Sequence, residues 1–476
     1  MQTEEQDKII FSSGKEKSLL VEARAGTGKT YTIVLIAKSF ENKTFQVIVF
    51  NKKNQLEMSD RLPKNAIGST AHSFCNKFIP RFKGHKPKLD TGKVFNLCFK
   101  NYNFKEDGLE KEEAYSIRED CMSLCDLISL CKSYFINPSV EDVLWIINHY
   151  QMTFNNPLDQ ISSDAIEILS KSDKDGGTID FDDMIRFPVI ENKINPQFDY
   201  FVIDEAQDNT PIRTILFKQM YEKGVNVIAV GDEFQSIYGF AGADCDSLSR
   251  IKESVKCQTL PLTINFRCAK KIIEKAQIYV PDIKAWDESP DGEVLISDQD
   301  SFYKSFSYGD VALSRYNKII IPPCFKLIKD GKKATIQGKD FGEMIIKMIR
   351  GFKSTTLDEF YSSLDRWRER QLKSNKHSSA LDAIDDKFEC LKFFADNSNT
   401  VEDIEKRVLS IFSDEKSDGL KFSTVHKAKG LEWDNVYILD SANFMQTRET
   451  QPWMIQQLRN LMYVAITRAK KNLIYV

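Results

Sequence analysis

The segment Ala23–Thr30, which reads ARAGTGKT, constrains the fold of this chain more than any other segment. It follows an apolar run at Ser18–Val21 that predicts a buried strand, and it opens a helical pattern at Thr30–Phe40. A glycine-rich turn between a strand and a helix is the context in which a loop can cradle phosphate groups. Gly26 and Gly28 let backbone N–H groups turn toward a phosphate. The segment therefore predicts a nucleotide-binding α/β domain.

The polar residues in and after this loop have the chemistry of a nucleoside triphosphate site. Lys29 is expected to reach the β- and γ-phosphates, and the Thr30 hydroxyl to hold Mg²⁺. A second apolar strand ends in acids at Phe201–Asp208, which reads FVIDEAQD. Asp204 is expected to bind the hydration shell of Mg²⁺, and Glu205 to orient and deprotonate the attacking water. ATP and Mg²⁺ are the predicted ligands. The predicted phosphate-loop contacts are Ala25, Gly26, Thr27, Gly28, Lys29 and Thr30.

Strand-like and helix-like patterns alternate in two parts of the chain, and each part is interrupted by a helical stretch. This alternation predicts parallel sheets covered by helices. The first helical stretch runs from about Phe95 to Leu169 and is followed by an expected loop at Lys171–Gly177. The second covers about Thr356–Phe412. The further strand candidates are Phe45–Phe50, Phe201–Ile203, Val225–Val230, Ser297–Arg315, Ala334–Gln337, Lys421–Val425, Asn435–Leu439 and Asn472–Val476.

Composition bounds the class of protein. The chain has 476 residues, of which 42% are hydrophobic and 28% charged, so it is globular in composition and long enough for two to four domains. The 66 Lys and Arg against 69 Asp and Glu give a net charge of −3, which by itself argues mildly against a nucleic-acid partner. A groove needs only local charge, so that inference stays open. Without an apolar run of 18 residues or a signal peptide, we expect an intracellular protein.

The ten cysteines are scattered along the chain and no CxxC motif occurs in the sequence, so we expect reduced thiols. Cys121, Cys125 and Cys131 lie in one apolar helical run. An iron–sulfur site needs four thiolates, for which Cys98 is a distant fourth. The burial preference of free cysteine favours helix packing over a cluster.

The order of the remaining motifs resembles that of superfamily 1 helicases of the UvrD/Rep/PcrA type. DEAQD resembles the acidic motif of that family. The segments FNK, AHS and NLMYVAITRAK are similar to the corresponding motifs of the F-box DNA helicase branch and of compact phage and bacterial UvrD-like helicases. The other matching segments are TEEQ with Gln6, Val49–Lys52 (VFNK), Ser69–Ser73 (STAHS), Val230–Ala243 (VGDEFQSIYGFAGA), Leu260–Cys268 (LPLTINFRC), Leu313–Asn317 (LSRYN), Gly338–Phe341, Lys421–Trp433 (KFSTVHKAKGLEW) and Asn460–Lys470.

The resemblance implies an α/β fold of two RecA-like P-loop motor domains with parallel sheets, each interrupted by a mainly helical insertion. The first motor domain is expected at residues 1–80 and 178–262, with its insertion at 81–177. The second is expected at 263–352 and 415–476. Its insertion, at 353–414, is short for the family.

The resemblance also assigns roles around the nucleotide. Gln6 is expected to read the adenine and Phe266 to stack on it, while Glu432 contacts the ribose. Gln235 is expected to sense the γ-phosphate and position water. Arg267 and Arg468 are expected to act as arginine fingers that stabilise the charge of the transition state.

A second set of residues is expected to bind a single DNA strand. Tyr238 and Phe240 match the stacking pair of the family, and bases stack on aromatic side chains without sequence preference. The other predicted strand contacts are Phe50, Asn51, His72, Thr424 and His426.

Together these features predict an ATP hydrolase that is a DNA helicase and single-strand translocase with 3′→5′ direction. Its expected substrates are single-stranded DNA and tailed duplexes, in DNA repair or replication. Its expected protein partner is a nuclease or a replication or repair factor. Its expected location is cytoplasmic or nucleoid-associated, or the host cytoplasm if the protein is viral. The short second insertion leaves an alternative open: a partner-regulated helicase-like NTPase subunit that senses nucleic acid or nucleotide, as in a phage-defence complex, with little unwinding of its own.

Overall fold

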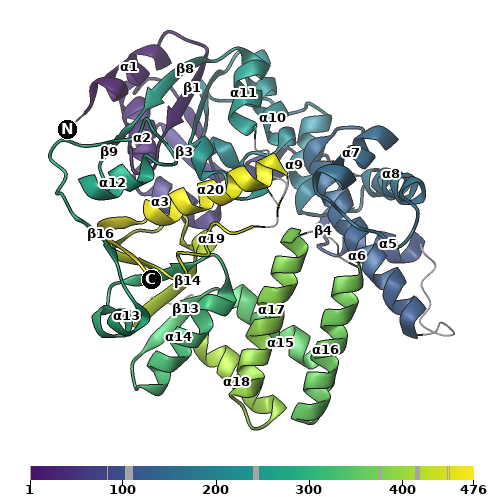
Figure 1. Cartoon of the computed structure of the whole chain (residues 1–476). Helices are drawn as coiled ribbons and strands as arrows, with labels where there is room; N and C mark the ends of the chain where they lie inside the picture. The colour runs from purple at the N-terminus through teal and green to yellow at the C-terminus, as the bar shows by residue number, and fades with distance from the viewer. Residues whose placement is uncertain are drawn as a thin grey trace. The chain divides into compact units, whose positions relative to one another are not determined.

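The chain divides by contacts into two compact units (Figure 1). The computed structural model describes residues 2–82, 84–101, 111–239, 246–374, 378–412, 419–447, 449 and 451–476. The first unit comprises Met1–Ala23 and Gly28–Leu262, and the second comprises Arg24–Thr27 and Thr263–Val476. Each unit contains a six-stranded sheet whose described strand pairs are all parallel. The predicted fold class, two α/β domains with parallel sheets and helical insertions, is confirmed.

The sheet of the first unit places the predicted nucleotide residues at one edge. Its order is β3-β2-β6-β7-β1-β8. Since β6, β7 and β1 are neighbours and parallel, the residues that follow their carboxyl ends come together there. Asp204 follows β6, and Asp232 follows β7. The strands are β1 (Ser18–Ala23), β2 (Phe45–Val49), β3 (Ala66–Thr70), β6 (Tyr200–Ile203), β7 (Asn226–Gly231) and β8 (Gln258–Leu262).

Helices cover both faces of this sheet, so each face has its own apolar core. Leu19 and Val21 of β1 belong to one core and Leu20 to the other, as the two-residue period of a strand requires. The helices and 3₁₀ turns of this α/β part are α1 (Glu4–Ser13), α2 (Lys29–Ser39), α3 (Lys52–Ser59), α4 (Ala71–Cys75), η1 (Asn76–Phe78), α9 (Phe181–Ile190), η2 (Ala206–Asp208), α10 (Pro211–Glu222), η3 (Glu233–Gln235) and α11 (Ser247–Val255).

The helical insertion of the first unit has a separate core. It contains α5 (Lys93–Asn101), α6 (Lys111–Tyr134), α7 (Val140–His149) and α8 (Leu158–Lys174), with the short strands β4 (Lys88–Leu89) and β5 (Thr178–Ile179) beside it. Cys98, Cys121 and Cys131 are buried among its apolar side chains, as the packing interpretation predicts. Among the described residues, no group of three or more metal-ligating side chains is arranged to hold a metal ion.

One boundary in this insertion differs from the prediction. The first four residues of the loop expected at Lys171–Gly177 are helical, so α8 ends at Lys174, later than predicted. Ser172 is buried on the same face as Ile168 and Leu169, so the buried stripe continues into the segment. Glu167 and Lys171 also form an ion pair at i, i+4 spacing, which supports one more turn of helix.

The sheet of the second unit has the order β11-β16-β15-β12-β14-β13. Its strands are β11 (Glu293–Ile296), β12 (Val311–Ser314), β13 (Ala334–Gln337), β14 (Leu420–Thr424), β15 (Trp433–Ile438) and β16 (Ala469–Tyr475). A two-stranded pair, β9 (Ile264–Asn265) and β10 (Lys284–Ala285), lies in the same unit. The helices around this sheet are α12 (Lys270–Ala276), α13 (Gln299–Ser305), α14 (Asn317–Lys329), α15 (Lys339–Gly351), α19 (Val425–Ala428) and α20 (Pro452–Ile466).

The stretch 297–315, which is predicted to be strand or strand edge, forms a strand only in its last part. Helix α13 occupies its first half, and β12 occupies only its last part. The Asp298 side chain caps α13 by accepting a hydrogen bond from the Ser301 N–H at 2.8 Å, and Phe302 is buried in the core. A capped turn with one buried aromatic residue is a stable start for a helix.

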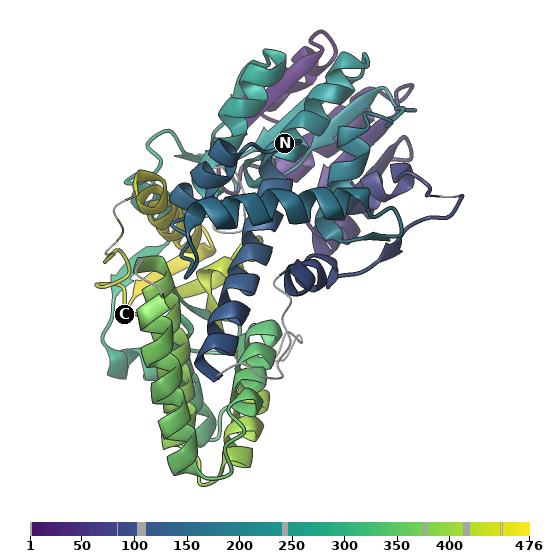
Figure 2. The same ribbon diagram turned by 90° about the vertical axis from the view of Figure 1, so that its right-hand side faces the viewer.

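The insertion of the second unit shares the core of its sheet. It consists of α16 (Leu357–Ser374), α17 (Ser378–Asp396) and α18 (Val401–Ile411), long helices that run side by side (green in Figure 2). Phe360, Leu391 and Phe394 from these helices belong to the same buried cluster as Ile336 and Phe422 from the sheet. Within the part of the chain that the structure describes, no helix has the length and apolar character needed to cross a bilayer.

Candidate functional site

The phosphate loop has the backbone geometry that the sequence predicts. Gly26 and Gly28 adopt positive φ angles of +66° and +80°, which residues with a side chain rarely adopt. Gly28 is the N-cap of α2, and no side chain caps this helix end. The first N–H groups of α2 are therefore available to an anion, and the helix dipole favours negative charge there. The Thr27 hydroxyl donates to the Arg24 carbonyl at 2.8 Å and shapes the loop.

Lys29, the first residue of α2, points into a group of carboxylates. Its Nζ lies 3.2 Å from Glu205 Oε2. Burial alone would lower the pKa of Lys29, but the charges of Glu205, Asp232 and Asp204 outweigh it, so the pKa is raised. Lys29 is therefore a fixed positive charge where the triphosphate is expected.

Asp204 and Glu205 directly follow β6 in the chain. Glu205 has a left-handed backbone with φ 53°, a strained conformation for a residue other than glycine, and its N–H donates to Asp204 Oδ1 at 3.0 Å. Burial, and then the charge of Glu205, raise the pKa of Asp204 to about 7, while a hydrogen bond from Thr30 lowers it. A hydroxyl and a carboxylate side by side are oxygen ligands of the kind that Mg²⁺ takes alongside phosphate oxygens and water. Thr30 and Asp204 thus fit the predicted metal role.

A chain of hydrogen bonds joins Glu205 to Gln235. Gln207 Nε2 donates to Glu205 Oε2 at 2.6 Å, and Gln207 Oε1 accepts from the Asp232 N–H at 2.9 Å. Gln235 Nε2 donates to Asp232 Oδ2 at 2.6 Å. Gln207, Asp232 and Gln235 are all buried. The expected catalytic base and the expected γ-phosphate sensor are therefore parts of one network.

Two members of this network, Gln207 and Asp232, were not predicted as site residues. Both lie inside the motifs DEAQD and VGDEFQSIYGFAGA, but a motif alone does not reveal which of its side chains bridge to another segment. A Cβ on Gly231 would lie 2.8 Å from Gln207 Oε1, so the glycine at the end of β7 is what lets Gln207 approach.

Gln6, the predicted adenine reader, is buried at the start of α1. Its Oε1 accepts from the Thr3 N–H at 3.1 Å, and Thr3 Oγ1 accepts from the Gln6 N–H at 3.2 Å, which is a capping box. Its Nε2 donates to Thr32 Oγ1 at 3.1 Å. Gln6 is thereby held against α2, one turn from the phosphate loop.

Two of the predicted strand contacts of the first unit, Phe50 and Tyr238, stack on each other. Phe50, which follows β2, stacks on Tyr238 with ring centroids 5.5 Å apart. Burial, and then the charges of Asp208 and Glu205, raise the pKa of the Tyr238 hydroxyl. Asn51 is exposed and caps α3, since its side chain accepts from the Asn54 N–H at 2.9 Å. Phe240, the other half of the predicted stacking pair, lies outside the described residues.

His72 lies beside an exposed ring that was not predicted. Phe181, the first residue of α9, contacts His72 edge to face at 5.9 Å between centroids, and 52% of Phe181 is exposed. Burial, and then the positive charge of Arg213, lower the pKa of His72 to about 4, so the imidazole is neutral at pH 7. The only signal for Phe181 is an aromatic residue directly after the helix cap Asp180.

The two predicted arginine fingers are held by partners within the second unit. Arg267 Nε lies 2.5 Å from Glu432 Oε2, so the predicted finger and the predicted ribose contact form an ion pair. Arg468 is buried, and its guanidinium donates to the carbonyls of Val464 and Leu431 at 3.0 and 3.1 Å. Any action on a nucleotide requires these side chains to exchange partners.

The other predicted residues of the second unit also occupy defined places. Phe266 lies edge to face against Trp286, with ring centroids 4.7 Å apart. Thr424 is buried at the N-cap of α19, which contains His426. Burial, and then the charges of Arg315 and Lys429, lower the pKa of His426 to about 4.

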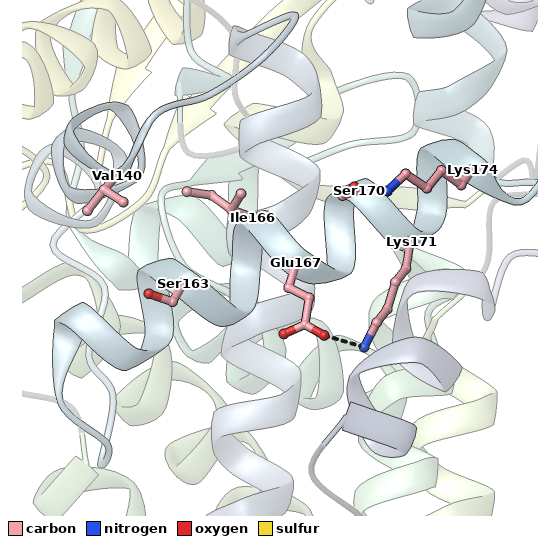
Figure 3. A pocket seen from close by; sticks show the side chains of 7 residues that line it. All are labelled: Val140, Ser163, Ile166, Glu167, Ser170, Lys171 and Lys174. Carbon is pink, nitrogen blue, oxygen red and sulfur yellow. Dashed lines mark ion pairs between the residues drawn. The ribbon is translucent and has the colours of Figure 1, made fainter.

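A pocket of about 620 Å³ is lined by residues other than these (Figure 3). It is formed by α8 and the first residue of α7. Lys171 Nζ lies 2.7 Å from Glu167 Oε1 on its wall. No predicted site residue contributes to it. Its lining residues are Val140, Ser163, Ile166, Glu167, Ser170, Lys171 and Lys174.

Comparison with known proteins gives two overlapping family matches. The UvrD/REP helicase N-terminal domain matches residues 2–256, and the UvrD-like helicase C-terminal domain matches residues 146–476. F-box DNA helicase protein 1 of Schizosaccharomyces pombe is 24% identical over 99% of this chain and 57% of its own length. ATP-dependent DNA helicase PcrA of Staphylococcus aureus is 25% identical over 76% of this chain and 49% of its own length.

A third relative matches over most of both chains. A probable DNA helicase II homolog of Mycoplasma genitalium is 24% identical over 98% of this chain and 84% of its own length. The chain thus spans about half the length of the first two relatives and most of the third.

Proposed function

Because the chain belongs to the UvrD/Rep helicase family, we propose that it is an ATP-dependent DNA helicase that moves along a single strand in the 3′→5′ direction. The observation that carries this proposal is the network from Lys29 through Glu205, Gln207 and Asp232 to Gln235. It joins a phosphate-binding cation, a carboxylate base and an amide sensor, which are the parts that triphosphate hydrolysis needs.

In the proposed reaction, the N–H groups at the start of α2 and the Lys29 ammonium bind the β- and γ-phosphates of ATP. Thr30 and Asp204 hold Mg²⁺, which neutralises charge on the phosphate oxygens when bound. Glu205 orients the attacking water and accepts its proton. Gln235 fixes the position of that water, since its amide is anchored on Asp232.

The second unit is proposed to complete the site. Arg267 and Arg468 leave Glu432 and the backbone carbonyls and donate to the γ-phosphate, which brings positive charge to the transition state. Glu432, once released from Arg267, is free to accept from a ribose hydroxyl. Phe266 stacks on the adenine and Gln6 hydrogen-bonds to its edge.

The strand-binding side is proposed to use the two aromatic pairs of the first unit. Bases are proposed to stack on the rings of Phe50, Tyr238, His72 and Phe181, at about 1–3 kcal/mol per base. The neutral His72 is suited to such contacts because it adds no charge that must be desolvated. Phe240, Asn51, Thr424 and His426 are proposed to complete the contacts to bases and phosphates.

The test compares ATP hydrolysis and unwinding in the same preparation. Lys29→Ala should reduce ATP turnover by about 100-fold or more, since it removes the phosphate cation, while strand binding persists. Lys171→Ala, an exposed lysine far from the network in sequence, is the control. A Lys29→Ala variant that hydrolyses ATP at the normal rate would refute the site.

Unwinding of 3′- and 5′-tailed duplexes tests the direction. Preference for 3′-tailed duplexes supports the proposal, and preference for 5′-tailed duplexes refutes the direction. ATP hydrolysis stimulated by single-stranded DNA without unwinding would favour the alternative, a partner-regulated NTPase subunit. The observation behind that alternative is the second insertion, which among the described residues consists of only the three helices α16–α18.

A further inference from the structure

Two cysteines of the first helical insertion lie in direct contact. Cys98 on α5 and Cys125 on α6 have their sulfur atoms 3.7 Å apart. A disulfide holds its sulfurs about 2.05 Å apart, so about 1.7 Å of approach separates this pair from a bond. The two residues come from different helices, and a bond between them would join α5 to α6.

Cys125 differs from the other described cysteines in its exposure. Of the nine described cysteines, it is the one that is not buried. It lines a pocket of about 350 Å³ together with Met122, Asp126 and Phe181. A small oxidant can therefore reach Cys125 from solvent, whereas Cys98 is buried and does not line the pocket.

The contact also activates the exposed partner. A hydrogen bond with Cys98 lowers the pKa of Cys125, although burial and the charge of Asp126 oppose this. The same contact, with burial, raises the pKa of Cys98. The arrangement is an accessible attacking thiol with a buried resolving thiol, which is how reactive cysteine pairs are built.

We propose that Cys98 and Cys125 form a disulfide when the protein meets a hydroperoxide, and that the pair is a reversible oxidation site. The Cys125 thiolate attacks one peroxide oxygen, the O–O bond breaks, and hydroxide leaves as a sulfenic acid forms on Cys125. The Cys98 thiolate then attacks the Cys125 sulfur, the S–S bond forms, and the S–O bond breaks. Two thiols supply two electrons and two protons, and one hydrogen peroxide becomes two waters.

The site is separate from the proposed nucleotide site, because none of the residues assigned to the nucleotide takes part. It does share a pocket wall with Phe181, which contacts His72. The disulfide closes a loop between positions 27 residues apart, so it restricts the unfolded chain and should raise the melting temperature of the insertion.

The experiment uses the full chain, treated with hydrogen peroxide, quenched, and alkylated in denaturant before digestion without reductant. Mass spectrometry should find a peptide containing Cys98 linked to a peptide containing Cys125, and dithiothreitol should remove it. Cys98→Ser should leave a sulfenic acid on Cys125 that dimedone traps. Cys131→Ser, on the same helix α6 but buried, is the matched control and should leave the linked peptide unchanged.

Met122, which is 57% exposed in the same pocket, reports whether the oxidant arrived. If Met122 is oxidised while Cys98 and Cys125 are both still alkylated, the proposal is wrong. A link from Cys98 to Cys121 instead of Cys125 would also overturn it. Thermal unfolding gives a second measurement: oxidation should raise the melting temperature by several degrees in the unmodified chain and not in Cys125→Ser.

Discussion

The two helical insertions are attached to their sheets in opposite ways. The helices α5–α8 have an apolar core of their own, separate from the two cores of the first sheet. The described apolar residues of α16–α18 in that cluster, such as Phe360, Leu391 and Phe394, instead extend the core of the second sheet. Apolar contact is tolerant of small shifts, whereas ion pairs are directional. Directional contacts therefore matter more for the position of the first insertion than for that of the second.

Buried charges provide such contacts. Lys93 Nζ on α5 lies 2.8 Å from Asp183 Oδ2. Lys132 Nζ on α6 lies 2.5 Å from Asp180 Oδ2 and 2.7 Å from Asp183 Oδ1. Helix α9, whose first turn begins after Asp180, packs Ile185 and Val189 into a core of the first sheet. Helix α9 thus faces the insertion with carboxylates and the sheet with apolar side chains. Phe181, beside His72, lies in the same turn.

Loss of one buried cation should have the largest effect. Lys132→Met leaves Asp180 and Asp183 with an uncompensated charge, which costs about 3–5 kcal/mol. Hydrogen exchange should accelerate in α5–α9 and not in the second unit. Lys171→Met is the control, because its pair with Glu167 is exposed on both sides. A loss below about 1 kcal/mol would show that the network does not hold the insertion.

The second insertion should respond differently to a core truncation. Phe394→Ala on α17 opens a cavity in the shared cluster and should cost about 3–4 kcal/mol. Hydrogen exchange should accelerate in β13 and β14 as well as in α16–α18. Leu409→Ala on α18 is the control, since 62% of Leu409 is exposed. If the faster exchange stays within the three helices, the core is not shared.

Acid should affect the two units alike. His72 in the first unit and His426 in the second both have pKa values of about 4, below the ordinary 6.5. Both are neutral when folded and bind protons more readily when unfolded, so their stability contribution is complete above pH 6.5 and is lost as the pH falls toward 4. At pH 5 each histidine should lower the free energy of unfolding by about 1 kcal/mol. This figure includes a reduction for solvent screening, because the rings are half-buried.

The measurement is the free energy of unfolding from denaturant titrations at pH 7.5, 6 and 5. His72→Gln should make the unfolding free energy of the first unit less dependent on pH. His426→Gln should have the same effect on the second unit. Equal pH dependence with and without both substitutions would contradict the assigned pKa values.

Local patterns carried most of the fold prediction. The phosphate loop follows from glycines at fixed positions between a strand and a helix, and Asp204 and Glu205 follow from acids after an apolar run. Because β6, β7 and β1 are neighbours in the sheet, the segments that follow these strands lie close together. The polar, glycine-ended segment Lys171–Gly177 (KSDKDGG) predicts a loop, although Ser172 within it is buried and α8 continues to Lys174.

The side-chain pairs were not predictable, because they join segments that are far apart in sequence. Gln207 bridges Glu205 to Asp232, and Arg267 pairs with Glu432. Phe181 reaches His72 only after an entire helical insertion has folded between them. Such contacts depend on tertiary packing, which no periodicity encodes.

The exposed ion pairs of the second insertion should have the smallest effect, and they complete the contrast with Lys132. Arg368 on α16 lies 2.9 Å from Asp385 on α17, and both side chains are about one-third exposed. Asp385→Asn should cost about 0.5 kcal/mol, because water and salt screen the pair and Arg368 keeps its place over the Phe388 ring. A double-mutant cycle with Arg368→Gln, at low and high salt, measures the coupling directly. A coupling above about 2 kcal/mol that persists at high salt would mean that ion pairs hold both insertions, and that the shared apolar core is not what distinguishes the second from the first.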